Sequence, residues 1–272
     1  MVKTWFFAVC CYWTVIGFAQ ANTLRIASSA NFSNTLQALT KEFAKQHPHR
    51  AKISTAATGV LYQQIRHGAP FDIFFSADVR HAQLLEQQQL IDESYRHTYA
   101  YGQLALWSNT EQSPISLDKL TDYRGRIAIA APHIAPYGLA AKQVLFNKNL
   151  WSKYHNQLIT GHNVNQTYQQ TLTGAVAYGF ICYSQLLRSN QGHGVLIDHR
   201  LHQPIEQQMV VLKNAKNHDL ARAFFDFVLS DAGQQLITES GYLPAKHITT
   251  DANSAATAST AHHQMVNQQS NK

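Results

Sequence analysis

The residue types best suited to chemistry gather in four short segments that are small, uncharged and rich in hydrogen-bond donors. Each lies where a predicted strand gives way to a predicted helix: residues 28–33, 56–59, 135–138 and 162–165. The first turn of a helix has backbone N–H groups without partners and carries the positive end of the helix dipole, so such junctions attract anions. None of the four contains Lys, Arg, Asp or Glu. The pattern predicts a site that holds an anion with neutral donors.

A site made only of donors also restricts the protonation state of its ligand. A buried anion can be fully hydrogen-bonded there without a salt bridge. A protonated oxyanion would direct its O–H at other donors, an unmatched contact that costs on the order of 1–3 kcal/mol. The segments therefore favour an oxyanion with no proton to donate, although each segment taken alone is also an ordinary helix start.

The elements that must position these segments alternate between short apolar runs and helical periodicity, which predicts βαβ units and a largely parallel sheet. Helices are expected to begin near Ser33, Thr58, Asp78 and Tyr137. Strands are expected at 24–27, 51–56, 71–76, 99–107, 126–130, 179–183 and 207–213. Open α/β sheets bind ligands at the carboxyl ends of their strands, which is where the four segments lie.

Composition excludes several classes of protein. The chain has 272 residues, of which 45% are hydrophobic and 14% charged, so it can bury a large core and is neither disordered nor a disulfide-stapled miniprotein. The formal net charge of +6 is spread along the chain without a run of five Lys or Arg residues. A nucleic-acid partner is therefore not expected.

The first 21 residues have the features of a signal peptide. Lys3 supplies a positive start, residues 5–19 are almost continuously apolar, and Ala19-Gln20-Ala21 matches the small-x-small cleavage pattern. The apolar run is short for a permanent membrane anchor. We expect an exported, periplasmic protein that begins at Asn22.

The two ends of the chain are expected to differ from its body. Removal of residues 1–21 leaves Cys182 as the single cysteine, so no internal disulfide can form. Cys182 lies in an apolar run and is interpreted as a buried, inert thiol. Residues 248–272 are Ala, Ser, Thr, Asn and Gln with few large apolar side chains, which predicts a disordered tail. The pair His262-His263 within it is weak evidence for a metal site.

Signatures of enzymes are missing from the sequence. No G-x-S-x-G, H-E-x-x-H, Walker or G-x-G-x-x-G pattern occurs. His193, His199 and His202 lie close together and leave open a secreted metal-dependent hydrolase, whereas their Gly- and Pro-containing surroundings are typical of a solvated loop. We expect a protein that is not an enzyme and needs no cofactor.

Over residues 23–247 the chain resembles the periplasmic molybdate-binding proteins of ABC transporters. The motifs that carry the resemblance occur in the family's order: Ala30-Asn31-Phe32, residues 58–65, residues 68–78, residues 132–138, residues 163–167 and Gly179-Phe180. The resemblance implies a two-lobed periplasmic-binding-protein fold of type II, in which each lobe has a central, mostly parallel sheet flanked by helices. The implied first lobe comprises 22–103 and 212–247, and the implied second lobe comprises 104–211, with the ligand in the cleft between them.

The resemblance also implies the residues that bind the ion. The first loop contributes asparagine where many members have serine, the second contributes a hydroxyl, and the third and fourth contribute backbone N–H groups. These positions are Asn31 with the adjacent Ala30 backbone, Thr58, Tyr137 and Val164. Some members add a tyrosine where this chain has Cys182, so that contact is expected to be missing.

The implied function is capture of molybdate or tungstate by closure of the two lobes, without covalent chemistry. A monomer of this kind would deliver the ion to an inner-membrane ABC permease. Donors spaced for the larger ions would lie too far from the oxygens of sulfate, because hydrogen bonds weaken steeply with distance. The alternatives are a binding protein for another oxyanion (sulfate, phosphate or a phosphonate) and the metal-dependent hydrolase.

Overall fold

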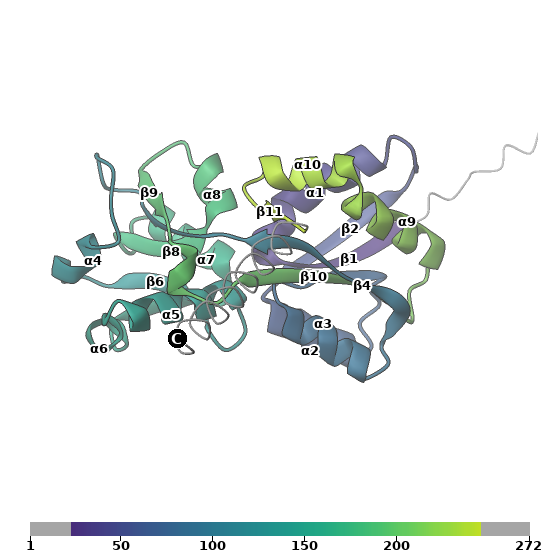
Figure 1. The fold of residues 1–272 in the computed structure, drawn as a ribbon, viewed down its shortest axis with the longest axis horizontal. Helices are drawn as coiled ribbons and strands as arrows, with labels where there is room; N and C mark the ends of the chain where they lie inside the picture. The colour runs from purple at the N-terminus through teal and green to yellow at the C-terminus, as the bar shows by residue number, and fades with distance from the viewer. Residues whose placement is uncertain (1–22, 246–272) are drawn as a thin grey trace, which may run out of the picture.

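Two separate β-sheets organise the chain, each at the centre of one α/β lobe (Figure 1). The computed structural model describes residues 23–245. The first sheet has six strands in the order β11-β4-β10-β3-β1-β2, and the second has five in the order β7-β6-β8-β5-β9. The expected signal peptide and tail lie outside the described residues. None of the helices within residues 23–245 has the length and apolarity to cross a bilayer.

The first lobe is built from both ends of the described chain. Its strands are β1 (Thr23–Ser29), β2 (Arg50–Ala56), β3 (Ile73–Phe75), β4 (Ile91–Gly102), β10 (Ile205–Leu212) and β11 (Leu243–Pro244). Its helices are the 3-10 turn η1 (Ala30–Phe32), α1 (Ser33–Phe43), α2 (Thr58–Arg66), α3 (Val79–Gln87), α9 (His218–Leu229) and α10 (Asp231–Glu239). Helices α1, α9 and α10 cover one face of the sheet, and α2 and α3 cover the other (Figure 1).

Alternation along the central strands explains why helices cover both faces of this sheet. Neighbouring residues of a strand point to opposite faces. Ile26 packs in the core beneath α1, α9 and α10, whereas the next residue, Ala27, packs in the core beneath α2 and α3. In β3, Phe75 packs beneath α1, α9 and α10, and Phe74 packs beneath α2 and α3. A strand buried on both faces is typically a continuous apolar run, as the Ile-Phe-Phe sequence of β3 is.

The second lobe is one continuous segment. Its strands are β5 (Leu104–Ser108), β6 (Ile127–Ala130), β7 (Leu158–Gly161), β8 (Tyr178–Cys182) and β9 (His193–Leu196). Its helices are α4 (Lys119–Asp122), α5 (Pro136–Asn147), α6 (Trp151–Tyr154), α7 (Val164–Leu172), α8 (Tyr183–Arg188) and the 3-10 turn η2 (His199–Leu201). Helix α5 packs on one face of the sheet, and α7 and α8 pack on the other around Trp107.

The two-lobed α/β fold is confirmed, but both sheets are mixed rather than mostly parallel. The parallel pairs centre on β1, which lies beside β2 and β3, and on β6, which lies beside β7 and β8. Strand β10 is antiparallel to β3 and β4, and β5 is antiparallel to β8 and β9. The antiparallel strands adjoin the crossings between the lobes, where the chain leaves one sheet and later returns to it in the opposite direction.

Strand pairing also places the crossings. The expected single strand at 99–107 is two strands in different sheets, because β4 ends at Gly102 and β5 begins at Leu104. The return crossing precedes β10, which pairs only within the first sheet. Residues 205–211 therefore lie in the first lobe by strand pairing, whereas the sequence-based boundary assigned them to the second.

Candidate functional site

The four donor-rich segments meet between the lobes around a small cavity, which we call the donor cavity. Its empty volume is about 210 Å³. The first lobe lines it with Ser29, Ala30, Asn31, Ala57, Thr58 and Ala77, and the second with Ala135, Pro136, Tyr137, Asn163 and Val164. All five residues named from the sequence are therefore brought together. None of the five is more than 4% exposed, so the lobes stand closed over the cavity.

Three helices begin at the cavity and leave backbone N–H groups there without protein partners. The carbonyl of Ala57 accepts from later residues of α2, and the carbonyl of Ala135 accepts from later residues of α5. Among the described residues, no hydrogen bond uses the N–H of Thr58, Tyr137 or Val164. These N–H groups lie in the first turns of α2, α5 and α7, where the helix dipole is positive.

The start of α7 shows how the sequence leaves one amide available. Asn163 caps the helix, and its Oδ1 accepts from the backbone N–H groups of Asn165 at 3.0 Å and Gln166 at 3.1 Å. Capping of this kind satisfies the second and third amides of the helix. The amide of Val164, the first in the helix, is left for a ligand.

Two hydroxyl groups form a short relay on the first-lobe side of the cavity. The N–H of Ala77 donates to Ser29 Oγ at 3.0 Å, and Ser29 Oγ lies 2.6 Å from Thr58 Oγ1. One of the two hydroxyl hydrogens is used between them, so the other remains to donate elsewhere. If Ser29 donates to Thr58, the Thr58 hydroxyl becomes a donor toward the cavity, strengthened by the bonds behind it.

The side chain of Asn31 is bonded to other protein groups. Its Nδ2 donates to Gln207 Oε1 at 2.8 Å and to the hydroxyl of Tyr242 at 3.4 Å. In this amide orientation, which follows from the hydrogen-bond network, the side-chain donor faces protein acceptors rather than the cavity. The backbone N–H of Asn31, in the first turn of η1, is the donor that it can offer a ligand.

The donor cavity carries no charge. Tyr137 is the one titratable side chain among the residues that line it, and burial raises the pKa of this phenol well above its usual value near 10. Cys182 is buried beside Ser184 rather than at the cavity. Burial raises the pKa of the Cys182 thiol to about 11, so the thiol stays protonated, in keeping with its interpretation as inert.

Contacts between the lobes surround the cavity. The N–H of Gly59 donates to the carbonyl of Ile134 at 3.0 Å, from the start of α2 to the loop before α5. The hydroxyl of Tyr242, in the first lobe, lies 3.1 Å from Ser184 Oγ of α8. These contacts hold the two halves of the site against each other.

Sequence reasoning missed several residues that build the site. Ser29 lay within a donor-rich segment but was not singled out, and Ala77 follows β3, another strand whose carboxyl end points at the cavity. The carboxyl-end rule for open sheets could have found Ala77. No local pattern marks Gln207, which lies in a strand, or Tyr242, which is distant in the chain.

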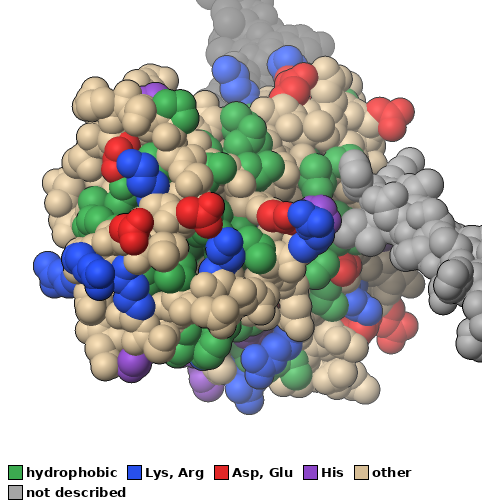
Figure 2. Space-filling view, turned by 60° about the vertical axis from the view of Figure 1, so that its left-hand side comes forward, with side chains coloured by type: hydrophobic (Ala, Val, Ile, Leu, Met, Phe, Trp, Pro, Cys, Tyr) green, Lys and Arg blue, Asp and Glu red, His purple; other side chains and the backbone are tan. Residues whose placement is uncertain are grey.

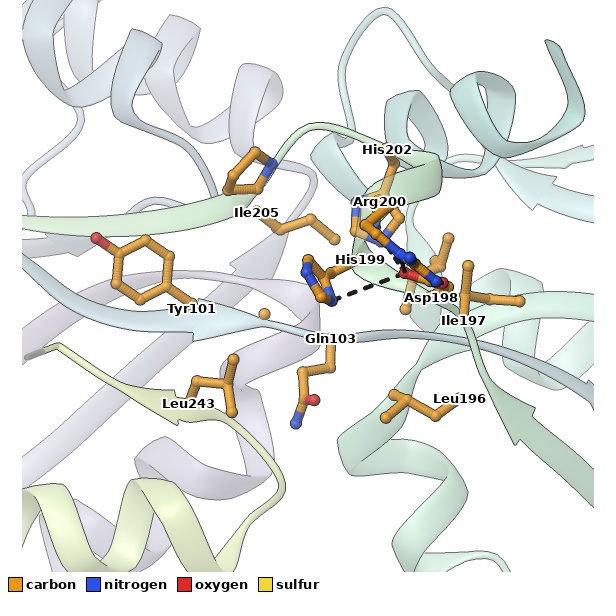
Figure 3. Close-up of a pocket in the computed structure, with 13 residues that line it drawn as sticks. Tyr101, Gln103, Leu196, Ile197, Asp198, His199, Arg200, His202, Ile205 and Leu243 are labelled. Carbon is orange, nitrogen blue, oxygen red and sulfur yellow. Dashed lines mark hydrogen bonds and ion pairs between the residues drawn. The ribbon is translucent and has the colours of Figure 1, made fainter. Parts of the chain in front are cut away.

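The candidate histidines lie elsewhere. His199 and His202, but not His193, line a larger groove at the crossings between the lobes, which we call the hinge groove (Figure 3). Its empty volume is about 1450 Å³, and its other lining residues include Tyr101, Leu196, Asp198, Arg200 and Leu243. Residues 23–245 contain no group of three or more His, Cys, Asp or Glu side chains placed to hold a metal ion.

The surface carries both signs of charge. Figure 2 shows Lys and Arg side chains interspersed with Asp and Glu across the face it draws. Several are paired, including Arg200 with Asp198 beside the hinge groove. The Arg200 guanidinium holds the pKa of the Asp198 carboxyl far below its usual range. The donor cavity is thus uncharged, whereas the surface of the protein carries charges of both signs.

Comparisons with known proteins all indicate the same family. The family described as bacterial extracellular solute-binding protein matches residues 24–243. The molybdate-binding protein ModA of Azotobacter vinelandii is 32% identical over 82% of this chain and 91% of its own length. The molybdate-binding protein ModA of Rhodobacter capsulatus is 30% identical over 83% of this chain and 90% of its own length.

Solved structures agree with this assignment. The periplasmic molybdate-binding protein of Azotobacter vinelandii superimposes with a TM-score of 0.77 at 33% identity, covering 81% of this chain and 98% of that one. The sulfate-binding protein SubI of Mycobacterium tuberculosis has a TM-score of 0.68 at 12% identity, which shows a shared fold alone. The family consists of solute-binding proteins rather than enzymes. The chain belongs to the bacterial extracellular solute-binding proteins and, among them, to the family of the molybdate-binding proteins.

Proposed function

We propose that this protein captures molybdate or tungstate between its two lobes and delivers the ion to an ABC importer. The observation that carries the proposal is the donor cavity, which is closed, uncharged and lined from both lobes. Support also comes from the relatives at 30% identity or more, which are named molybdate-binding proteins.

Each lobe has its own part in binding. From the first lobe, the Thr58 hydroxyl and the backbone around Ala30 and Asn31 donate to the ion. From the second, the backbone N–H groups of Tyr137 and Val164 donate to it. An ion that bonds to both lobes is bound more tightly by the closed form than by the open one, so it shifts the equilibrium toward closure.

The donor set favours a fully deprotonated tetrahedral oxyanion. No carboxylate lines the cavity to accept a proton from hydrogen phosphate. A smaller ion such as sulfate would leave some of its oxygens beyond hydrogen-bond distance of donors spaced for molybdate. Binding of another oxyanion in place of molybdate is the alternative that the experiment below must separate.

Delivery of the ion to a permease requires that the protein be exported to the periplasm. Residues 1–21 favour export to the periplasm, where the mature protein would act as a monomer and dock on an inner-membrane ABC permease. Closure presents both lobes to the permease in one fixed arrangement, so the loaded protein is distinguishable from the empty one. Neither a cofactor nor a nucleic acid is needed for this role.

Isothermal titration calorimetry on the mature protein tests the proposal directly. We expect saturable heat with sodium molybdate and sodium tungstate at micromolar protein, and no displacement of either ion by excess sulfate or phosphate. Absence of heat with both molybdate and tungstate would contradict the proposal. Displacement of molybdate by sulfate would indicate the other oxyanion instead.

A further inference from the structure

A fully buried glutamine lies behind the donor cavity and contacts both lobes. Gln207, on β10, has no exposed surface and does not line the cavity. Its Oε1 accepts from Asn31 Nδ2 at 2.8 Å and from the hydroxyl of Tyr99 at 2.8 Å. Its Nε2 donates to the hydroxyl of Tyr137, in the second lobe, at 3.3 Å. A buried amide is costly unless it is bonded in this way, so Gln207 depends on these partners.

The orientation of the Gln207 amide agrees with its first-lobe partners. In the hydrogen-bond network of the site, Asn31 Nδ2 donates to Gln207, so the Gln207 atom that faces it is the oxygen. Tyr99 is buried, and burial raises the pKa of its phenol well above 10, so the phenol keeps the proton that it donates to the same oxygen. The amide nitrogen is then turned toward Tyr137 of the second lobe.

A glycine leaves the space in which Gln207 and Tyr137 meet. Gly102 ends β4 at the outward crossing, and a Cβ atom there would overlap the hydroxyl of Tyr137. The same Cβ would lie 2.9 Å from Tyr137 Cζ and 2.6 Å from Gln207 Nε2. Gly102 is not among the glycines with positive φ in the described chain, so the position requires space rather than an unusual backbone conformation.

Asn31 is held from a second side by another residue that spans the lobes. The hydroxyl of Tyr242 donates to the backbone carbonyl of Asn31 at 2.8 Å and lies 3.1 Å from Ser184 Oγ in the second lobe. Both residues that hold Asn31, Gln207 and Tyr242, therefore also contact the second lobe. These contacts connect η1 to the second lobe.

We infer that Gln207 is a positioning residue that couples lobe closure to the geometry of Asn31, by docking the Tyr137 hydroxyl into the space left by Gly102. The inference rests on the proposed function for its ligand. Gln207 stabilises the closed form and holds Asn31 with its backbone donor toward the cavity, without touching the ion. Its loss allows the closed protein to open more often and releases the ion faster.

The neighbouring residue on the same strand supplies a matched control. Gln208 is also a largely buried glutamine, but its Oε1 accepts from Arg96 and its Nε2 donates to Thr98, both in the first lobe. Replacement of either glutamine by leucine removes a buried amide from β10. Only Gln207→Leu removes a contact with the second lobe.

Stopped-flow measurement of molybdate release, combined with small-angle scattering, tests the inference. We expect Gln207→Leu to raise the dissociation rate about tenfold, the size of effect that follows from losing buried hydrogen bonds. We expect it also to enlarge the ligand-free protein in solution, whereas Gln208→Leu lowers the melting temperature and changes neither quantity. A folded Gln207→Leu protein that releases molybdate at the wild-type rate would overturn the inference.

A second pair of variants tests whether the Tyr137 hydroxyl needs the space left by the absence of a side chain at Gly102. Gly102→Ala should weaken molybdate binding by preventing full closure. Adding Tyr137→Phe should recover part of the loss, because the closest overlap is with the hydroxyl and the Tyr137 backbone donor is kept. Gly102→Ala with wild-type affinity would overturn the inference. Failure of the wild-type protein to bind molybdate would instead contradict the proposed function, and the scattering of the ligand-free variants would still report on Gln207.

Discussion

Two of the cavities between the lobes, the donor cavity and the hinge groove, are opposites in size and chemistry. The donor cavity has an empty volume of about 210 Å³, and none of its lining residues is charged. The hinge groove has an empty volume of about 1450 Å³ and combines apolar residues such as Leu196 with Asp198, Arg200 and two histidines. The charged groups of the groove face solvent, where Arg200 and Asp198 pair with each other.

The comparison shows that the larger cavity is not the better candidate for a small oxyanion. Such an ion has only a few oxygens, and each needs a donor at hydrogen-bond distance rather than a large apolar surface. Helix starts from both lobes supply those donors at the donor cavity. The hinge groove offers Arg200, but this side chain is already paired with Asp198.

The largest expected effect comes from placing a negative charge in the donor cavity. Thr58 is 1% exposed, so the carboxylate of Thr58→Asp would lie close to the bound anion. Two like charges about 4 Å apart in partly buried surroundings repel by about 4 kcal/mol. We expect molybdate affinity to fall by on the order of a thousandfold, measured by titration calorimetry.

The matched change in the hinge groove is Leu196→Asp. Leu196 is 43% exposed, so the new carboxylate remains in water, where charge interactions are weak. Molybdate affinity should be unchanged. If Leu196→Asp weakens binding as much as Thr58→Asp does, with both proteins folded, the site has been assigned to the wrong cavity.

Removal of one hydroxyl from the donor cavity has the next largest effect. Thr58→Ala deletes the group at the end of the relay from Ala77 and Ser29. An unpaired contact to a buried anion costs about 1–3 kcal/mol, and we expect affinity to fall by that amount. Asn31→Ala should cost a similar amount, because it leaves Gln207 without one of its donors.

A variant in the hinge groove serves as the control for these two changes, with molybdate affinity measured by calorimetry in each protein. His199→Ala alters the hinge groove at a side chain that is 92% exposed and should leave affinity as in the wild type. Wild-type affinity in both Thr58→Ala and Asn31→Ala would contradict the assignment of the donor cavity.

Most of the site could be predicted because its chemistry is local. The residues around a helix start indicate its free amides, so the four segments could be identified from local patterns. The family resemblance then selected Thr58, Tyr137 and Val164 within them, and all three line one cavity. Apolar runs likewise predicted most strands. Resemblance to a known family added the arrangement of two lobes, which no local pattern contains.

The parts of the fold and of the site that could not be predicted depend on contacts between distant parts of the chain. The break in the expected strand 99–107 arises because Gly102 and Leu104 belong to different sheets, although the apolar pattern continues across them. Gln207 and Tyr242 lie 176 and 211 residues from Asn31, which they hold. Sequence patterns of a single strand or helix give no information about such pairs, so the network behind the cavity became visible only in the fold.

A smaller effect is expected at the cap of α7. Asn163→Ala removes the acceptor for two backbone amides beside Val164 and should lower the free energy of unfolding by about 1 kcal/mol. It should also weaken molybdate binding a few-fold, because the first turn of α7 is then less firmly held. Chemical denaturation and calorimetry measure the two quantities.

Ser230→Ala provides the comparison for this cap. Ser230 caps α10 by accepting from the N–H of Gly233 and does not line the donor cavity. The expected loss of stability is similar, and the affinity should not change. Equal weakening of molybdate binding by both variants would mean that general destabilisation, rather than the amide of Val164, is responsible.

The smallest expected effect is that of pH on affinity. The one titratable group lining the donor cavity is Tyr137, whose pKa burial raises well above 10, so the cavity keeps the same protonation state from about pH 6 to about pH 9. In the hinge groove, by contrast, a bound ligand would lie beside histidines, of which His202 has its pKa lowered by burial.

The ion pair of Asp92 makes stability depend on pH, and this contribution changes outside that window. Arg222 lowers the pKa of Asp92 in the folded protein. This stabilisation is fully present above the unfolded pKa near 3.8 and is lost as the pH falls through the lower folded value. Molybdate titrations across the window from about pH 6 to about pH 9 therefore report on a folded protein and should give a constant dissociation constant. Uptake or release of a proton on binding, detected as a heat that depends on the ionisation enthalpy of the buffer, would place a titrating group at the site and favour the hinge groove over the donor cavity.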